Sequence, residues 1–227
     1  MVKKDIVVIT GATRGIGYSI AKDLEMDNQV ISIGRQKHGM EIPGEFFRCD
    51  ITNEKEVKET VKSVINKYHR IDVLINCAGV MLYNDLTKAT IEEFEQSFNV
   101  NVKGTFLMCR EVIPHMRKQK RGYIINISSV RGITAAPGKG IYSATKFAVR
   151  ALTETILLEN QKYNIKATSI CPGIIWTDST IDKLRREGLT KDDVIWEDDI
   201  VKTVRYLLSL SPKAYVREII IGGRLHG

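Results

Sequence analysis

The sequence lacks the long apolar runs that mark membrane-spanning and secreted proteins. Its uninterrupted apolar runs are short, such as Ile6 to Ile9, whereas a membrane-spanning helix needs about 20 predominantly apolar residues. Lys3 and Lys4 precede that run, and no small-residue cleavage pattern follows it, so the sequence predicts no secretory signal. We therefore expect a cytoplasmic protein without a membrane partner.

The sequence also lacks clustered metal ligands. Its four cysteines and four histidines are scattered along the chain, and structural metal sites need ligands at short local spacings. Each cysteine lies within or beside an apolar run, which is typical of buried, reduced thiols. The sequence therefore predicts no metal site and four structural cysteines, namely Cys49, Cys77, Cys109 and Cys171.

Aromatic residues are few, which limits how the basic charge can be interpreted. Lys and Arg exceed Asp and Glu by 34 to 27, a net charge of +7, while aromatic residues make up 7% of the chain. The densest basic run, Arg117 to Arg121, ends an amphipathic segment and precedes Gly122, as expected at a helix C-terminus. Platforms for single-stranded nucleic acid need aromatic side chains between such charges, so we expect no nucleic-acid partner. A cofactor with several phosphates suits the charge.

Short apolar runs alternate with segments of helical period along the chain, and this alternation predicts an α/β fold with a parallel sheet. No segment rich in Pro, Gly or Ser divides the chain, so we expect one doubly wound domain over residues 1–227, with helices on both faces of the sheet. The predicted strands are Ile6–Thr10, Val30–Ile33, Phe46–Cys49, Val73–Ile75, Tyr123–Ile127, Lys166–Ile170 and Glu218–Ile221.

Two of the predicted helices have recognisable starts. Asn53 followed by Glu56, and Thr90 followed by Glu93, are typical of capped N-termini. The pattern from Thr90 predicts one long helix that breaks or kinks near Pro114. The other helices are predicted around Ile16–Leu24, over Ile141–Glu159 and over Glu197–Leu210.

A glycine-rich turn connects the first predicted strand to the first helix. Gly11, Gly15 and Gly17 have the spacing Gly-x-x-x-Gly-x-Gly. Glycines at such a turn let the backbone approach a pyrophosphate, and the following helix N-terminus offers it unpaired N–H groups. A merely flexible turn is the alternative, but the position directly after the first strand favours dinucleotide binding.

The end of the second predicted strand bears on the choice between NAD and NADP. An NAD site usually places an acidic residue there to bond the ribose 2′-hydroxyl, whereas this strand ends in Gly34 and Arg35. Arg35 together with Arg14 is suited to grip a 2′-phosphate by charge-assisted hydrogen bonds, so we expect NADP. Two solvated surface arginines are the alternative. Asp50, after the third strand, is a candidate partner for the adenine amino group or a plain turn residue.

Tyr142 and Lys146 lie four residues apart in a predicted helix, which places the phenol and the ammonium on one face. Free tyrosine has a pKa near 10, and each unit of lowering needs about 1.4 kcal/mol of preferential phenolate stabilisation. A fixed neighbouring cation supplies part of that energy. Taken alone, such a pair is usually structural, so its meaning depends on the motifs around it.

Several further motifs accompany this pair in order along the chain, and with them the sequence resembles the short-chain dehydrogenase/reductase family. The resemblance covers nearly the whole chain. The motifs are Thr10–Gly17, Asn76–Gly79, Val100–Gly104, Ser128–Ser129, Tyr142 with Lys146, and Pro172–Thr177. Cys77 departs from the family pattern, which has a second asparagine there, and we expect this change to be tolerated.

The resemblance implies a Rossmann-type fold with a seven-stranded sheet and a catalytic set of Asn101, Ser129, Tyr142 and Lys146. The residues expected to hold NADP are Gly11, Thr13, Arg14, Gly15, Ile16, Gly17, Arg35, Asp50, Ile51, Asn76, Ala78, Gly79, Tyr142, Lys146, Pro172, Gly173, Ile175 and Thr177. Relatives commonly pair through the helices at 91–117 and 141–160, which implies a homotetramer or homodimer.

The implied reaction is hydride transfer between the nicotinamide and a substrate carbon, coupled to proton transfer by Tyr142. Lys146 would lower the phenol pKa and hold the nicotinamide ribose, Ser129 would hydrogen-bond the carbonyl oxygen, and Asn101 would anchor a water relay. A small-molecule carbonyl or alcohol is the expected substrate. Two alternatives remain: a 3-oxoacyl-thioester reductase that docks an acidic carrier protein, and a non-catalytic dinucleotide-binding regulator.

Overall fold

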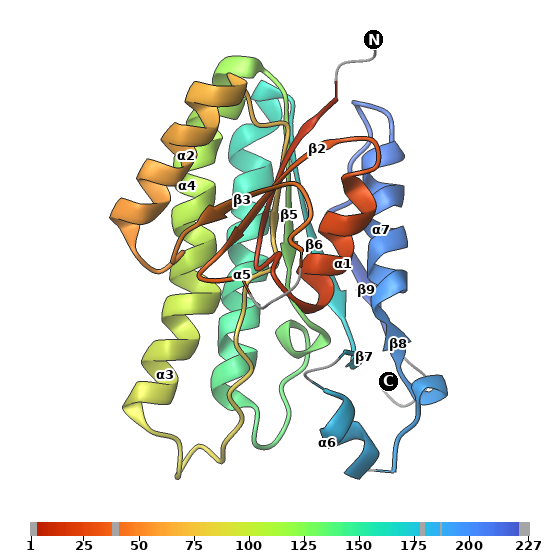
Figure 1. Cartoon of the computed structure of the whole chain (residues 1–227). Helices are drawn as coiled ribbons and strands as arrows, with labels where there is room; N and C mark the ends of the chain where they lie inside the picture. Colours follow the sequence, from red (N-terminus) through yellow and green to blue (C-terminus); the bar gives the residue numbers. More distant parts are fainter. Residues whose placement is uncertain (1–3, 38–40, 178–179, 187, 223–227) are drawn as a thin grey trace.

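The computed structural model describes residues 4–37, 41–177, 180–186 and 188–222, and its centre is a seven-stranded parallel sheet. The strand order is β3-β2-β1-β4-β5-β6-β9, so the order reverses beside β1, as in a doubly wound Rossmann-type fold. The strands are β1 Ile6–Thr10, β2 Gln29–Gly34, β3 Glu45–Arg48, β4 Val73–Asn76, β5 Gly122–Ile127, β6 Ile165–Pro172 and β9 Glu218–Ile221 (Figure 1).

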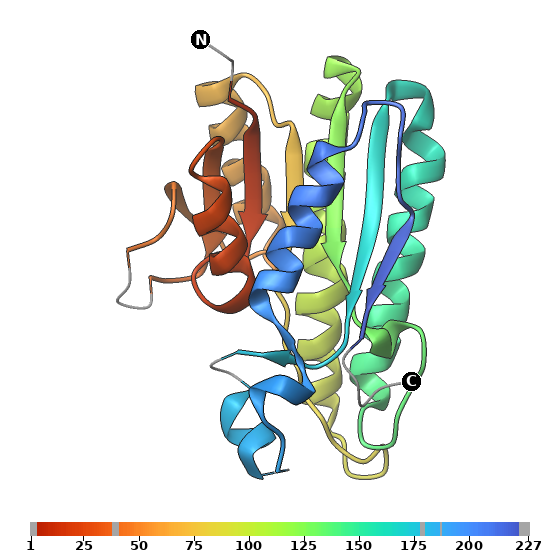
Figure 2. The same ribbon diagram turned by 90° about the vertical axis from the view of Figure 1, so that its right-hand side faces the viewer.

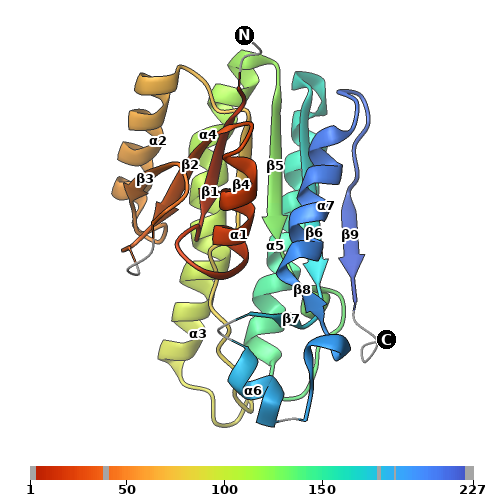
Figure 3. The same cartoon turned by 45° about the vertical axis from the view of Figure 1, so that its right-hand side comes forward.

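Helices cover both faces of this sheet, as the alternating pattern predicts. α1 (Gly15–Leu24) and α7 (Glu197–Ser209) lie on one face, while α2 (Glu54–Tyr68), α4 (Thr105–Gln119) and α5 (Gly140–Asn160) lie on the other (Figures 1 and 3). Two buried apolar clusters result, one beneath each helical layer. The strands carry nearly continuous β-branched runs because both of their faces are covered.

The helix predicted from Thr90 is longer and less regular than expected. The capping box of Thr90 and Glu93 is present at the start of α3 (Ile91–Phe98), which confirms the predicted start. A π-helical segment, Asn99–Gly104, then joins α3 to α4. The sequence predicts a break or a kink near Pro114, and the break is wrong, since α4 continues through this residue. Pro114 lies on the exposed side of α4, where solvent satisfies the carbonyl that loses its donor.

The end of α4 differs in one detail from the expected glycine stop. The basic run does end the helix, but Lys120 adopts the left-handed conformation, with φ of 53°, and caps it. Gly122 instead begins β5. The hydrogen bonds of the cap, from the Lys120 and Arg121 backbone N–H groups to the last turn, satisfy carbonyls there and account for this ending.

The segment after β6 contains structure that short-range patterns do not predict. β7 (Ile175–Trp176) pairs in parallel with β8 (Ile195–Trp196), and α6 (Ile181–Arg186) lies between them in the chain. Figure 2 shows these elements beyond the carboxyl ends of the main strands. Among the described residues, no helix is both long and apolar enough to cross a membrane.

Candidate active site

The predicted site residues gather where the main strands end, at the lower edge of the sheet in Figure 1. β1 leads into the glycine turn, β4 into Cys77–Gly79, β5 into Ser128–Ser129 and β6 into Gly173. Ligands of open α/β sheets bind outside the carboxyl ends of the strands, near the point where the order reverses. The topology therefore brings these separate motifs together at one ligand-binding edge.

The glycine turn is shaped by close backbone contacts. Gly11 has φ of +69°, and a Cβ atom there would lie 2.7 Å from the Ala78 Cα. The Thr10 hydroxyl accepts hydrogen bonds from the backbone N–H groups of Cys77 (3.1 Å) and Ala78 (3.2 Å). Only glycine permits this approach, so Gly11 and Thr10 join the loops after β1 and β4.

The start of α1 fits the phosphates of a dinucleotide. Gly15 has φ of +56° with open space where a Cβ would stand, and Gly17 packs against the Gly11 carbonyl. No side chain caps α1, and its first turn holds no acidic residue. Uncapped N–H groups at a helix N-terminus, beside open space, suit an anion. The residues present therefore fit the pyrophosphate of NAD(P).

The ends of β2 and β3 form a small hollow of about 140 Å³, lined by Arg35, Arg48, Asp50 and Glu56. The two carboxylates are engaged locally. Asp50 Oδ1 accepts from the Thr52 N–H (2.9 Å) and hydroxyl (2.8 Å), and Glu56 accepts from the Asp50 N–H (2.9 Å). Asp50 thus serves its own turn, which was one of its two predicted roles.

Arg48 is a member of this hollow that the sequence analysis missed. Its Nε donates to the Arg35 carbonyl at 3.3 Å, which places the two residues side by side. Neither guanidinium forms an ion pair with any residue that the structure describes. The register of β2 with β3 pairs Gly34 with Arg48. This long-range strand pairing brings Arg48 beside Arg35, and the order of residues along the chain does not indicate it. Arg14 is exposed at the N-cap of α1 and does not line the hollow.

Tyr142 and Lys146 face the same space on α5, as their spacing predicts. Both side chains are buried, and the Lys146 Nζ lies 5.7 Å from the centroid of the Tyr142 ring. Nζ also donates to the Ile127 carbonyl at 2.8 Å. Burial lowers the pKa of Lys146 to about 8, because the charged ammonium loses solvation. A Cβ at Gly79 would lie 3.7 Å from this Nζ, so the loop after β4 faces the ammonium.

The environment of Tyr142 keeps its phenol protonated in the protein alone. Burial raises the pKa of Tyr142 well above its usual value, and the nearby Tyr83 adds to the rise. The Tyr83 ring meets the Tyr142 ring edge to face, with centroids 5.5 Å apart. A hydrogen bond with Ser129 opposes the shift and lowers the pKa. The phenol is therefore a proton donor at neutral pH, because desolvation dominates the shift and Lys146 does not lower the pKa of the phenol as the sequence predicts.

Ser129 is fixed at the end of β5 beside this phenol. Its Oγ accepts from the Arg131 N–H at 3.1 Å and donates to the Pro172 carbonyl at 3.4 Å. The side chain is buried. The Ser129 hydroxyl is close enough to the Tyr142 phenol to lower its pKa, and two neighbouring hydroxyl groups are suited to one carbonyl oxygen.

Asn101 lies in the π-helical segment, where its side chain is buried and engaged by protein. Oδ1 accepts from the Val80 N–H at 2.8 Å, while Nδ2 donates to the Val80 carbonyl and the Thr145 hydroxyl, each at 3.0 Å. Asn101 therefore braces the loop after β4 against α5 between Tyr142 and Lys146. π-Helical segments of this kind are frequent at functional sites.

The other predicted cofactor residues fall into two groups. Asn76 and Ile51 are buried and contact other parts of the protein beneath the carboxyl edge of the sheet. Asn76 Nδ2 donates to Asn126 Oδ1 at 2.8 Å, and Ile51 packs against Gly104. The remaining residues line the ends of β1, β2 and β6, where Gly173 N–H donates to the Ile221 carbonyl at 2.7 Å. This second group consists of Thr13, Ile16, Pro172, Gly173, Ile175 and Thr177.

All four cysteines are free thiols. Burial raises the pKa of Cys77 and Cys109 to about 12, so their thiols stay protonated. In the ranges that the structure covers, no group of three or more His, Cys, Asp or Glu residues is placed to hold a metal ion.

Comparison with known sequences identifies relatives along nearly the whole chain. The family described as short chain dehydrogenase matches residues 5–188. An uncharacterised oxidoreductase of Staphylococcus saprophyticus is 34% identical over 238 residues, covering 97% of this chain and 96% of the relative. A 3-ketodihydrosphingosine reductase of Bacteroides thetaiotaomicron is 35% identical over 204 residues, covering 89% of this chain and 75% of the relative.

Solved structures with the same fold include proteins with bound NADP. The protein ElxO with NADP bound superposes with a TM-score of 0.85 at 28% identity, covering 96% of this chain and 97% of ElxO. A closed form of serine dehydrogenase complexed with NADP⁺ gives a TM-score of 0.89 at 26% identity, covering 98% of this chain and 96% of that protein.

Proposed function

Because the chain belongs to the short-chain dehydrogenase family and is thus an oxidoreductase, we propose that it interconverts a carbonyl and an alcohol by NADP(H)-dependent hydride transfer. Tyr142 acts as the acid–base group in this proposal. The observation that carries it is the buried contact of Tyr142 with Ser129 and Lys146 at the carboxyl edge of the sheet. We further propose that residues 1–227 form one NADP-binding oxidoreductase domain.

With NADPH as the cofactor, we propose that the enzyme works in the direction of reduction, with the protonated phenol of Tyr142 as the acid. NADPH, when bound, supplies the hydride that reaches the carbonyl carbon. The protonated phenol donates a hydrogen bond to the carbonyl oxygen and then its proton, so that the oxygen becomes a hydroxyl. The Ser129 hydroxyl turns from the Pro172 carbonyl, its acceptor at 3.4 Å, and donates a second hydrogen bond to the same oxygen while negative charge develops on it. General acid help of this kind contributes roughly 10²- to 10⁴-fold in rate, and the oxyanion contact adds to it.

Lys146 and Asn101 prepare this step. The ammonium of Lys146, 5.7 Å from the phenol ring, stabilises the phenolate that forms as Tyr142 gives up its proton, and it is placed to hold the nicotinamide ribose. Asn101 holds the Val80 backbone and Thr145, so it fixes the two elements between which the proton path runs. We propose that water reaches Tyr142 through this region.

The preference for NADP rests on Arg35, Arg48 and Arg14. The guanidinium groups of Arg35 and Arg48 line one hollow at the ends of β2 and β3, and neither forms an ion pair with a carboxylate among the described residues. Both groups are therefore suited to bind a phosphate dianion. No acidic residue ends β2, where NAD enzymes place one. Related structures carry NADP, which agrees with this assignment.

The substrate is proposed to be a small-molecule carbonyl compound or the corresponding alcohol. A 3-oxoacyl thioester on an acidic carrier protein is the narrower alternative, and the net charge of +7 is the observation that favours it. Turnover with carrier-bound substrate that falls steeply with salt, without turnover of free ketones, would select this alternative.

We propose that the enzyme works in the cytoplasm as a homodimer or homotetramer paired through α3 with α4 and through α5. These helices carry large apolar side chains on the surface, including Phe94, Phe106, Phe147 and Leu158. Exposed apolar groups on neighbouring helices suit an interface between copies of the chain. Light scattering of the purified protein measures the oligomeric state, and a monomer would overturn this part of the proposal.

The proposed activity is tested by following NADPH and NADH oxidation at 340 nm with a panel of ketones, aldehydes and 3-oxoacyl thioesters. We expect turnover with NADPH that Tyr142→Phe abolishes while NADPH binding, followed by its fluorescence, stays within twofold. Binding of NADPH without turnover of any compound would favour a regulatory nucleotide-binding protein instead.

A further inference from the structure

One ion pair behind the active site connects three elements that are far apart in the chain. Arg150 lies one helical turn after Lys146 on α5, and its guanidinium contacts Glu218 of β9 through two nitrogens, Nε and Nη2, the latter at 3.0 Å. The third nitrogen, Nη1, donates to the Gly132 carbonyl at 2.5 Å. The side chains of Arg150 and Glu218 are only 29% and 27% exposed. One side chain therefore links α5, the edge strand β9 and the turn after β5.

The turn that receives this bond is the one that Ser129 begins. Val130–Gly132 form a short 3₁₀ helix capped by the Ser129 side chain, and Gly132 N–H donates to the Ser129 carbonyl at 2.8 Å. The Arg150 contact at Gly132 therefore acts on the opposite end of the same turn. A displacement of Gly132 moves the Ser129 hydroxyl, because one turn of helix separates them.

Gly132 is also packed against the backbone of Lys146. A Cβ at Gly132 would lie 2.8 Å from both the Lys146 carbonyl oxygen and the Ser128 hydroxyl. Ser128 donates from that hydroxyl to the same Lys146 carbonyl at 3.0 Å. The turn that carries Ser129 and the helix that carries Lys146 are thus in direct contact at Gly132. The carbonyl of this same residue accepts the hydrogen bond from Arg150.

We propose that Arg150, oriented by Glu218, is a positioning residue that holds the Ser129 turn against the Tyr142–Lys146 face of α5. This inference rests on the proposed function, since it assigns Arg150 to the distance between the two hydroxyl groups that contact the carbonyl oxygen. A bidentate guanidinium–carboxylate pair fixes the orientation of its remaining donor. Misplacement of reacting groups by about 1 Å lowers rates by roughly 10²-fold.

The structure offers a matched control in Arg205 of α7. Arg205 contacts Asp23 through Nε, Asp27 through Nη1 at 2.6 Å, and the Asp23 carbonyl through Nη2 at 2.8 Å. Its side chain and that of Asp23 are 32% and 28% exposed, which closely matches the Arg150 pair. Arg205→Met and Arg150→Met should therefore lower the melting temperature by similar amounts.

Kinetics separate positioning from stability. We expect Arg150→Met to lower kcat about 10- to 100-fold with the Kd for NADPH within twofold, and Arg205→Met to leave both within twofold. Arg150→Lys keeps a charge beside Glu218 but cannot hold Gly132 at the same time, so it should recover melting temperature and not kcat. Glu218→Gln, which keeps the volume, should lower kcat less, and the variant with both changes should be no slower than Arg150→Met alone.

Amide hydrogen exchange supplies a readout that needs no turnover. The N–H groups of residues 131–134 should exchange at least tenfold faster in Arg150→Met, and not in Arg205→Met. If the wild-type protein reduces no carbonyl but Arg150→Met still speeds exchange at residues 131–134, the proposed function fails. The role of Arg150 in holding the Ser129 turn against α5 is then still supported. Wild-type exchange rates in Arg150→Met, or a kcat within twofold of wild type, would overturn the positioning role.

Discussion

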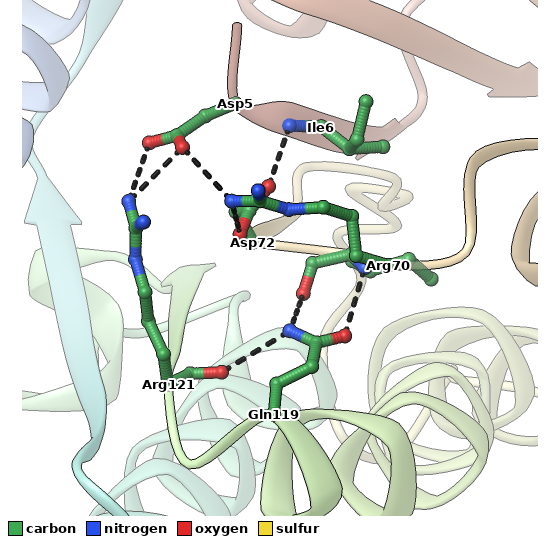
Figure 4. Close-up of polar contacts among 7 residues, drawn as sticks. Asp5, Ile6, Arg70, Asp72, Gln119 and Arg121 are labelled. Atoms are coloured by element: carbon green, nitrogen blue, oxygen red, sulfur yellow. Dashed lines mark hydrogen bonds and ion pairs between the residues drawn. The ribbon is translucent and has the colours of Figure 1, made fainter. Parts of the chain in front are cut away.

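The two ends of the parallel sheet treat their charged groups in opposite ways. At the amino end, shown in Figure 4, charges are mutually paired: Asp72 pairs with Arg70, while Asp5 contacts Arg70 at 3.3 Å and Arg121 at 2.9 Å. At the carboxyl end, the buried Lys146 has a carbonyl as its hydrogen-bond acceptor, and Arg35 has no ion pair among the described residues. The amino-end charges are thus paired with one another, whereas Lys146 and Arg35 at the carboxyl end have no carboxylate partner among the described residues.

The amino-end cluster also fixes the start of the sheet through the backbone. Asp72 is almost fully buried and accepts from the Ile6 N–H at 2.8 Å, which joins the starts of β4 and β1. Gln119, at the end of α4, accepts from the Ile71 N–H at 3.1 Å and donates to the Ile71 carbonyl at 2.8 Å. Buried polar groups that satisfy one another in this way make the strand register specific. At the carboxyl edge, Thr10 and Asn101 instead bond the backbone of the loop after β4.

The largest expected effect comes from removing the phenol at the carboxyl edge. Tyr142→Phe deletes the proton donor without changing the ring, so kcat should fall by about 10²- to 10⁴-fold. The melting temperature and the Kd for NADPH should stay near wild type, because the phenyl ring keeps its packing. Single-turnover kinetics with NADPH measure the effect. Residual turnover above a tenth of wild type would mean that Tyr142 is not the acid.

The counterpart at the amino end should affect stability alone. Asp72→Ala leaves the Ile6 N–H and part of the Arg70 charge without a partner, and breaking a buried pair typically costs about 3 kcal/mol. We expect urea denaturation to show this loss, with kcat per folded molecule unchanged. Asp198→Ala is the control: its pair with Lys202 is 59% and 73% exposed, so its removal should change stability by less than about 1 kcal/mol. A fall in kcat for Asp72→Ala would contradict the expectation that the amino end of the sheet affects stability alone.

Removing the free guanidinium groups should change the choice of cofactor more modestly. Arg35→Ala and Arg48→Ala should each weaken NADPH binding about 10- to 100-fold while NADH binding stays constant, since a charge-assisted hydrogen bond is worth roughly 1.5 to 3 kcal/mol. Arg14→Ala tests the third arginine in the same way. Fluorescence titration with each nucleotide gives the Kd ratio.

The neighbouring cation Lys37 controls for general charge. Its Nζ lies 5.4 Å from the Phe46 ring centroid, and it does not line the hollow with Arg35. Lys37→Ala should therefore leave the NADPH-to-NADH ratio within twofold. An unchanged ratio in both Arg35→Ala and Arg48→Ala would discard the 2′-phosphate site.

Local patterns were sufficient for most of the fold, because each apolar run and each cap acts over a few residues. The β1 strand and the Thr90 capping box could be predicted in this way. The π-helical segment Asn99–Gly104 could not, since the Asn101 side chain bonds Val80 and Thr145 across the structure. The β7–β8 pair was missed for a similar reason: each strand has two residues, and they are paired across a long insertion.

The site shows the same division between local and long-range information. Tyr142, Lys146 and Ser129 could be proposed because their spacing and motifs are local, and in the fold all three lie at the carboxyl edge of the sheet. Arg48 and Arg150 were missed because their partners, Arg35 and Glu218, lie on other strands. The sign of the Tyr142 pKa shift was also missed, since it is set mainly by burial, which is a property of the packed structure.

The smallest expected effect is a stability change that runs opposite to that of Asp72. The pKa of Lys146 is lowered from 10.5 to about 8, so between pH 8 and 10.5 the unfolded chain binds the proton that the folded chain has lost. Stability from this group therefore rises with pH through that window. Lys146→Met removes a burial cost of about 3 kcal/mol at pH 7 but leaves the Ile127 carbonyl without its donor at about 2 kcal/mol.

The net expectation is a Lys146→Met protein that is about 1 kcal/mol more stable than wild type at pH 7 and about 1 kcal/mol less stable at pH 9.5. The Cys109 thiol, whose pKa burial raises without a contribution from Lys146, opposes the rise in both proteins and cancels in the difference. Urea denaturation of the two proteins at each pH gives the crossover. A difference in stability that does not change with pH would mean that Lys146 is solvated like a surface lysine. Burial at the carboxyl edge would then not destabilise the charged form of this side chain.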